Sequence, residues 1–144
     1  MKKIIVLGAS GTIGQNTLDI IRTFRERFSL AGVSVHTNIR TLDALRTEFQ
    51  IADFAVTDAA AAAHYEKKHG SLERFLHDTA ADIVVNGIAG AAGLQASLIA
   101  VRTHRTLALA NKESIVMAGE LLQKEAAKYG CTIIPVDSEH SAIY

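Results

Sequence analysis

The sequence has 144 residues, of which 49% are hydrophobic and 21% charged, and its 15 basic side chains balance 15 acidic ones. This length and composition are typical of a soluble globular domain with a substantial core. A net charge of zero gives no basis for binding nucleic acid or a membrane surface, the single cysteine excludes an intrachain disulfide, and no apolar run approaches the roughly 20 residues of a membrane span. We therefore expect a cytoplasmic protein.

Short β-branched runs alternate with helical stretches along the chain. The expected strands are KIIVLG, SLAGVSV, ADFAVTD, DIVVNG, TLALA and CTIIPVD, which begin at Lys3, Ser29, Ala52, Asp82, Thr106 and Cys131. Apolar spacing predicts helices over residues 12–27 and 114–129, the second ended by Gly130, and the alanine run 59–63 predicts a surface helix. The alternation predicts an α/β fold: a doubly wound parallel sheet, Rossmann-like, in a single domain, with ligands bound at the carboxyl ends of its strands.

The first motif, GASGTIG, follows the first expected strand and opens a helix. Gly8, Gly11 and Gly14 permit a tight turn and let a pyrophosphate approach the helix N-terminus, where free N–H groups favour anions. Ser10 and Thr12 add hydroxyl donors at the same place. This context indicates a dinucleotide-binding turn. The alternative is a glycine-rich turn that only packs the helix onto the strand.

The end of the second expected strand bears on the choice of cofactor. An NAD site usually has an acidic residue there, for the ribose 2′-hydroxyl, but no acid lies between Glu26 and Asp43. The window SVHTNIR instead offers four polar side chains: His36, Thr37, Asn38 and Arg40. Because a guanidinium can bind a 2′-phosphate in a bidentate way, the window favours NADPH. In the alternative interpretation, Arg40 is a solvated residue in the first turn of the next helix.

Two further polar clusters end the fifth and sixth expected strands. They are Asn111, Lys112, Glu113 and Ser114 in LALANKES, and Asp137, Ser138 and Glu139 in PVDSEH. The helix dipole disfavours a lysine at a helix N-terminus, so Lys112 either reaches solvent or is held there for an anion or a reacting oxygen. Asp137 and Glu139 share one side of an extended chain, where two carboxylates suit Mg²⁺ or Mn²⁺. Each cluster by itself is also compatible with a solvated strand end.

Taken together, GASGTIG, GIAGAAGL from Gly87, LALANKES and PVDSEHSAIY resemble the amino-terminal part of 1-deoxy-D-xylulose 5-phosphate reductoisomerase. The resemblance covers the chain from Lys3 to Tyr144. It implies an NADPH- and divalent-metal-dependent oxidoreductase that makes 2-C-methyl-D-erythritol 4-phosphate from 1-deoxy-D-xylulose 5-phosphate in the non-mevalonate isoprenoid pathway. It further implies that residues 1–144 form the NADPH-binding domain, ending at the first metal-ligand motif. The catalytic and C-terminal domains would then lie outside this chain, which would be inactive alone, and the full-length protein would be a homodimer.

The resemblance also assigns roles to single residues. Those matched to NADPH are Ser10, Gly11, Thr12, Ile13, Asn111 and Glu113, and the glycine turn adds Gly8 to the expected cofactor-binding residues. Asp137 and Glu139 match metal ligands. Lys112, Ser138 and Glu139 match substrate-binding residues, and Lys112 and Glu139 match catalytic residues. Where the family commonly has Gly-Lys-Asn, this chain has His36, Thr37 and Asn38. The missing lysine leaves Arg40 or His36 as the expected contact to the 2′-phosphate.

Two other functions are compatible with parts of this pattern. One is a stand-alone nucleotide-binding regulatory module, which would not account for Asp137 and Glu139 at the ligand edge. The other is a different NADP-dependent reductase, such as a semialdehyde dehydrogenase, which needs a nucleophilic cysteine. Cys131 stands at the start of a strand, so we expect it at the edge opposite the ligand, as a buried and unreactive thiol.

Overall fold

The computed structural model describes residues 1–65, 69–110 and 112–136, without the side chains of residues 112–114. Its centre is a six-stranded, all-parallel sheet with the strand order β3-β2-β1-β4-β5-β6. The strands are β1 (Lys2–Leu7), β2 (Phe28–Val35), β3 (Asp53–Val56), β4 (Ile83–Asn86), β5 (Thr106–Leu109) and β6 (Ile133–Pro135). The six predicted strands and the predicted α/β fold class are confirmed.

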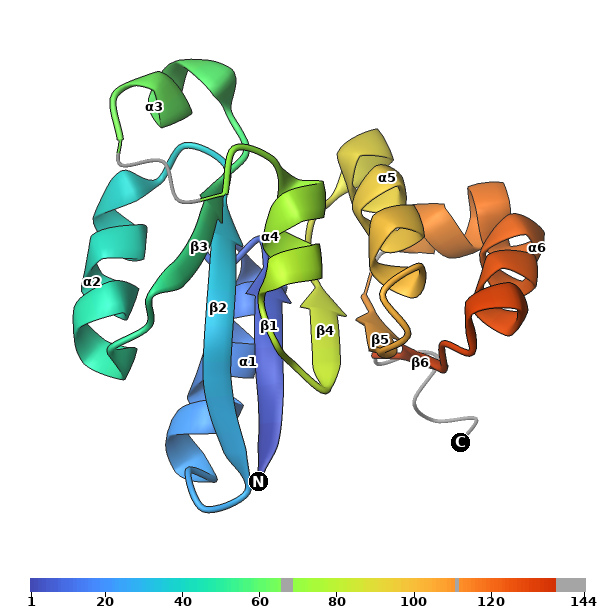
Figure 1. Ribbon diagram of the computed structural model, residues 1–144, viewed down its shortest axis with the longest axis horizontal. Coiled ribbons are helices and arrows are strands. Elements are labelled where there is room, and N and C mark those ends of the chain that lie inside the picture. Colours follow the sequence, from blue (N-terminus) through green and yellow to red (C-terminus); the bar gives the residue numbers. More distant parts are fainter. Residues whose placement is uncertain (66–68, 111, 137–144) are drawn as a thin grey trace.

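Helices cover both faces of the sheet, as expected for a doubly wound fold. They are α1 (Thr12–Thr23), α2 (Ile39–Phe49), α3 (Ala59–Ala63), α4 (Leu72–Asp78), α5 (Gly90–Val101) and α6 (Lys112–Tyr129). In Figure 1, α4 lies in front of β1, and α1 lies behind β1 and β2. None of the helices in the described ranges is long and apolar enough to cross a membrane.

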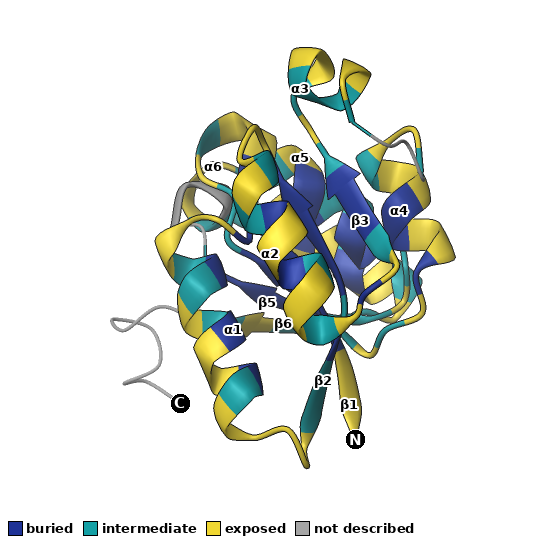
Figure 2. Cartoon of the chain, turned by 90° about the vertical axis from the view of Figure 1, so that its left-hand side faces the viewer, coloured by how far each residue is buried: buried dark blue, intermediate teal, exposed yellow. Residues whose placement is uncertain are grey.

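Alternating side chains of the strands build two separate cores. Ile4 and Val6 of β1 pack with α1 and α2 on one face, while Ile5 and Leu7 pack with α4, α5 and α6 on the other. Such an alternation of buried residues is expected when both faces of a parallel strand are covered. Figure 2 shows the buried strands inside and exposed residues on the outer sides of the helices. The alanine helix α3 has no buried residue, which confirms the predicted surface helix.

One boundary of each of the two predicted amphipathic helices needs correction: the end of the first and the start of the last. The first helix was expected to reach residue 27 but ends at Thr23, because residues 24–27 form the turn into β2, in which the N–H groups of Arg27 and Phe28 both bond to the carbonyl oxygen of Phe24. The last helix begins at Lys112, two residues before the expected start, and has non-helical dihedral angles at Ala118 (φ −145°, ψ 25°). It ends where predicted, with Gly130 at a φ of 66°.

Candidate functional site

The chain reverses its strand order between β1 and β4, and the glycine motif lies at that point. β2 and β3 follow β1 on one side, whereas β4, β5 and β6 extend the sheet on the other. The carboxyl ends of β1 and β4 are in register, with Leu7 opposite Asn86. In open parallel sheets, ligands bind in the crevice outside the strand ends at such a reversal.

Two glycines of the motif are required by the geometry of the turn. Gly8 has a φ of +72°, a left-handed conformation that side chains rarely adopt. Gly14 lies on the inner side of α1, where an added Cβ would stand 2.4 Å from the Gly8 carbonyl oxygen and 2.6 Å from the Ala9 Cα. The helix can therefore approach the strand end this closely only without a side chain at position 14.

The N-terminus of α1 is open to an anion. Gly11 occupies the N-cap without a side-chain hydrogen bond, and the first turn contains no acidic residue. Ser10, Gly11 and Thr12 are exposed, whereas Ile13 is half-buried. The free N–H groups and the positive end of the helix dipole favour a phosphate here. Five of the predicted cofactor residues, Gly8 and residues 10–13, thus surround one turn whose free N–H groups would suit an anion.

Ser34, near the carboxyl end of β2, fixes this turn and was not identified from the sequence. It is buried, its hydroxyl accepts a hydrogen bond from the Gly8 N–H (3.1 Å), and its carbonyl oxygen accepts one from the Ala9 N–H (2.8 Å). The only signal in the sequence is a serine within an otherwise apolar strand end. Its partner lies 26 residues away, so the contact becomes visible only when the strands are placed side by side.

The four residues predicted to recognise a 2′-phosphate follow β2 and are exposed. Asn38 caps α2, since its side-chain oxygen accepts the Thr41 N–H at 3.0 Å. Arg40 lies in the first turn of α2, and no described residue forms a hydrogen bond or ion pair with it. An exposed and uncommitted guanidinium at this place is available to bind a phosphate.

An acidic residue that is distant in the sequence lies near the carboxyl end of β2. The Asp58 carboxylate, which follows β3, lies 3.9 Å from the His36 Nε2, and the His36 Nδ1 lies 3.0 Å from the Thr57 hydroxyl. Asp58 also caps α3 through the Ala61 N–H at 2.9 Å. The segment between Glu26 and Asp43 has no acidic residue, but in the folded chain Asp58 lies near its strand end. The Asp58 carboxylate is close to His36.

The remaining predicted site residues lie outside the described part of the structure. This holds for Asn111, Asp137, Ser138 and Glu139, and for the side chains of Lys112 and Glu113. The backbone of Lys112 opens α6 directly after β5, on the same edge of the sheet as the glycine turn. Among the described residues, no three histidine, cysteine or acidic side chains are grouped in a way that could hold a metal ion.

Cys131 precedes β6 and so lies at the amino edge of the sheet, away from the glycine turn. The thiol is half-buried, less enclosed than the sequence predicted, and burial raises its pKa above the usual value. A thiol with a raised pKa on the wrong edge cannot attack a substrate held at the carboxyl ends of the strands. This placement argues against the semialdehyde dehydrogenase alternative.

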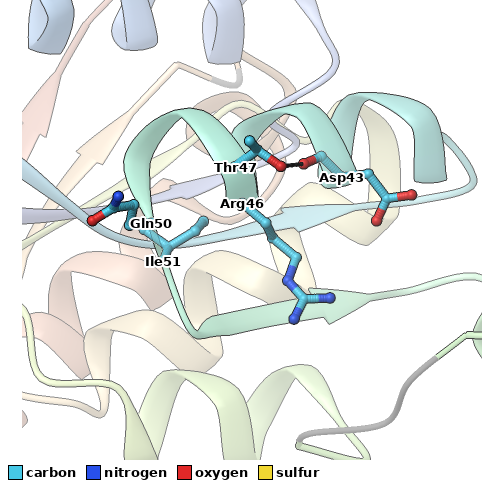
Figure 3. A pocket seen from close by; sticks show the side chains of 5 residues that line it. All are labelled: Asp43, Arg46, Thr47, Gln50 and Ile51. Carbon is cyan, nitrogen blue, oxygen red and sulfur yellow. Dashed lines mark hydrogen bonds between the residues drawn. The ribbon is translucent and has the colours of Figure 1, made fainter.

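A second concave feature lies along α2. Asp43, Arg46, Thr47, Gln50 and Ile51 line an open hollow of about 470 Å³ (Figure 3). The Arg46 guanidinium stacks 4.5 Å from the centre of the Phe54 ring and donates a hydrogen bond to the Tyr65 hydroxyl at 2.9 Å. Gln50 and Ile51 stand at the end of α2 that faces the amino edge of the sheet. The hollow is thus separate from the glycine turn.

Comparison with known proteins decides the family. A family model described as 1-deoxy-D-xylulose 5-phosphate reductoisomerase matches residues 4–119. The chain belongs to this family. A reductoisomerase of this name from Treponema denticola is 50% identical over 144 residues, which are 99% of this chain and 38% of that relative. The chain thus spans less than two fifths of the length of this reductoisomerase.

Solved structures of reductoisomerases share the fold. A DOX-P reductoisomerase in complex with NADPH, fosmidomycin and magnesium matches with a TM-score of 0.86 and 38% identity, over 100% of this chain and 38% of that one. The Zymomonas mobilis reductoisomerase in complex with NADPH matches with a TM-score of 0.83 and 33% identity, over 96% and 39% of the two chains. The Rossmann-like sheet is therefore the fold of the amino-terminal part of this reductoisomerase family.

Proposed function

We propose that this chain is the NADPH-binding domain of a reductoisomerase that converts 1-deoxy-D-xylulose 5-phosphate to 2-C-methyl-D-erythritol 4-phosphate in non-mevalonate isoprenoid biosynthesis. The observation that carries the proposal is the uncapped, acid-free N-terminus of α1, set under the Gly8 turn where the strand order reverses. In a chain of the reductoisomerase family, this turn is suited to the pyrophosphate of a dinucleotide.

NADPH fits the residues that surround this turn. The Gly11 N–H already donates to the Gly8 carbonyl oxygen, so the N–H groups of Thr12 and Ile13 in the first turn of α1 would hold the pyrophosphate. The Arg40 guanidinium would hold the 2′-phosphate, with His36 from the same strand end as the alternative contact. Asp58 approaches the same region, but one of its oxygens already accepts the Ala61 N–H. NADPH bound here would supply the hydride, and the protein would supply its position and the surrounding field.

The metal and substrate residues extend this proposal to the whole enzyme. Asp137 and Glu139 offer oxygen ligands of the kind that Mg²⁺ or Mn²⁺ prefers, and such an ion would act as a Lewis acid on the substrate oxygens. Lys112, Ser138 and Glu139 would bind the substrate, and Asn111 and Glu113 would contact the cofactor. We place the remaining catalytic and C-terminal domains in the part of the relatives' length that this chain does not span, so the chain alone would not turn over substrate. A cytoplasmic location and a homodimeric full-length enzyme stay predictions.

Calorimetric titration of the 144-residue chain with NADPH and NADH tests the cofactor proposal. We expect NADPH to bind at least about tenfold more tightly, because a charge-assisted hydrogen bond is worth roughly 1.5–3 kcal/mol. Arg40→Ala should weaken NADPH binding by about the same factor and leave NADH binding unchanged, since only NADPH carries the 2′-phosphate.

Arg27→Ala is the matched control for the change in charge. Arg27 is exposed and immediately precedes β2, at the amino edge of the sheet. Its loss lowers the net charge by the same amount and should leave both affinities unchanged. Equal affinities of the wild-type chain for the two cofactors would overturn the NADPH proposal. An unchanged preference in Arg40→Ala would move the 2′-phosphate contact to His36 or Thr37.

A further inference from the structure

A second buried polar side chain, Asn86, lies on the other side of the strand reversal. Asn86 ends β4 and is completely buried. Its amide nitrogen donates to the Gly93 carbonyl oxygen (2.8 Å) and to the Ser97 hydroxyl (2.7 Å), both in α5. Its amide oxygen accepts the Ile88 N–H (3.0 Å). One side chain therefore links the strand end, the turn after it and the following helix.

The residue type at this position follows from these three bonds. Only an amide offers two N–H donors and a carbonyl acceptor in this arrangement. An aspartate would bring a carboxylate oxygen against the Gly93 carbonyl oxygen, and an apolar side chain would leave the Ile88 N–H and the Gly93 carbonyl without this partner. An asparagine in a strand end that is otherwise apolar is thus explained by the turn that it holds.

The turn held by Asn86 borders the same crevice as the glycine turn. A Cβ added at Gly8 would lie 3.1 Å from the Gly87 carbonyl carbon, and one added at Gly87 would lie 3.2 Å from the Ile13 Cβ. The two turns are in close contact, so a shift of residues 87–89 by a few tenths of an ångström changes the space between them. The N-terminus of α5, which follows, has no side-chain cap and no acid in its first turn.

We propose that Asn86 is a positioning residue for the nicotinamide half of the dinucleotide. The inference rests on the proposed NADPH-binding function. A dinucleotide lies across the strand reversal with one mononucleotide on each half of the sheet. Because the predicted 2′-phosphate contacts follow β2, the adenosine half occupies that side and the nicotinamide half lies beside β4. Asn86 holds the turn on the nicotinamide side through the Ile88 N–H, and Ser97 supports it.

Two ligands separate this role from a general loss of stability. NADPH spans both halves of the site, whereas adenosine 2′,5′-bisphosphate reaches only the half beside β2. Asn86→Ala should weaken NADPH binding by about tenfold and bisphosphate binding by a clearly smaller factor, because the bisphosphate reaches the glycine turn only through its 5′-phosphate and has no part beside β4. Ser97→Ala removes one of the three bonds and leaves the other two, so it should fold well and shift NADPH affinity in the same direction by a smaller factor.

Arg105→Met is the matched control. The Arg105 guanidinium donates two hydrogen bonds to the carbonyl oxygens of Leu76 and Thr79, and it lies just before β5, at the amino edge. Its loss should lower the melting temperature and leave the affinities for both ligands unchanged. Calorimetry is run well below the melting temperature of each variant.

The outcomes distinguish the two proposals. Absence of NADPH binding to the wild-type chain would overturn the proposed function itself. If the wild-type chain binds NADPH and folded Asn86→Ala binds it with unchanged affinity, the role of Asn86 is overturned. If Asn86→Ala does not fold, unchanged NADPH affinity in Ser97→Ala overturns that role. The role is also overturned if Asn86→Ala loses affinity equally for both ligands, or if Arg105→Met loses as much NADPH affinity as Asn86→Ala. Either result would show that Asn86 contributes only to the stability of the fold.

Discussion

Position 14 has no room for a side chain. An added Cβ would stand 2.4 Å from the Gly8 carbonyl oxygen and 2.8 Å from the Ala9 carbonyl carbon. These are backbone atoms, so they cannot move aside as the end of a flexible side chain would. Any residue other than glycine must push α1 away from the end of β1 and open the turn that we assign to the pyrophosphate.

We predict that Gly14→Ala lowers the free energy of unfolding by about 1–3 kcal/mol through overpacking. Gly119→Ala is the matched control, because an added Cβ at Gly119 in α6 would meet nothing within 4 Å. That variant should change the free energy of unfolding by no more than about 1 kcal/mol, because the added methyl group meets no atom and Gly119 directly follows the non-helical Ala118. Urea unfolding followed by circular dichroism measures both changes. Similar changes in the two variants would contradict the close approach at Gly14.

Residues whose role depends only on their neighbours along the chain could be identified from the sequence. Gly8, Gly11 and Gly14 follow a strand at a recognisable spacing, and their places in the structure agree with that pattern. Ser34, Asn86 and Asp58 were missed, because their importance comes from neighbours brought close by the strand order. The Asp58 carboxylate approaches His36 only because β2 and β3 lie side by side.

At the scale of elements, an ion pair joins α1 and α2 near their C-terminal ends. The Arg22 Nε and Nη2 donate to the two carboxylate oxygens of Glu48 at 2.6 and 2.7 Å, and the Arg22 Nη1 donates to Asp19 at 2.7 Å. The hydrogen bond from Arg22 is the main reason that the pKa of Glu48 is lowered below its usual value of 4.5. Both side chains are about one third exposed, so solvent screens much of the interaction.

We predict that Glu48→Gln lowers the free energy of unfolding by about 0.5–1 kcal/mol at pH 7. Because the pKa of Glu48 is lowered in the folded state, its contribution is complete above pH 4.5 and disappears as the pH falls through the lower folded value. The variant and the wild-type chain should therefore converge at acidic pH. Urea unfolding at pH 7 and at successively lower pH values measures the difference.

Glu120→Gln is the control for this pH dependence. Glu120 pairs with Lys124 one turn along α6, at 3.2 Å, and its side chain is 86% exposed. Such a pair contributes little, so the variant should differ from the wild-type chain by no more than about 0.3–0.5 kcal/mol at any pH. A Glu48→Gln difference that persists at acidic pH would show that the carboxylate charge is not the cause.

The helix boundaries show where apolar spacing stops being informative. Phe24 fits the period of the first helix, yet it is 41% exposed and caps α1 with its N–H on the Ile20 carbonyl oxygen. The chain has to reverse there, because Phe28 must pair with Lys2 at the start of the sheet. The strands were easier to predict, since each is a short apolar run, and β2, β4 and β5 are largely buried on both faces.

At the scale of the whole molecule, the candidate site is assembled from several strand ends. The turn after β1 is the one that we assign to the pyrophosphate, the exposed Arg40 follows β2, and the turn after β4 is held by Asn86. Parallel pairing brings all three to one edge, which the alternation of strands and helices predicted. The positions of Asp137 and Glu139 were predicted from the motif alone, and they lie outside the described residues.

The most direct test of this account is a titration of the ¹⁵N-labelled chain with NADPH, followed by the chemical shifts of its backbone amides. The cofactor should shift three groups of signals most strongly: residues 8–13, residues 36–40 and residues 87–90, which lie at the carboxyl edge. Signals from Asp53, Arg105 and Cys131, at the amino edge, should stay in place. If the largest shifts occur at the amino edge or around the hollow beside Arg46, the dinucleotide does not bind at the strand reversal, and the central claim is wrong.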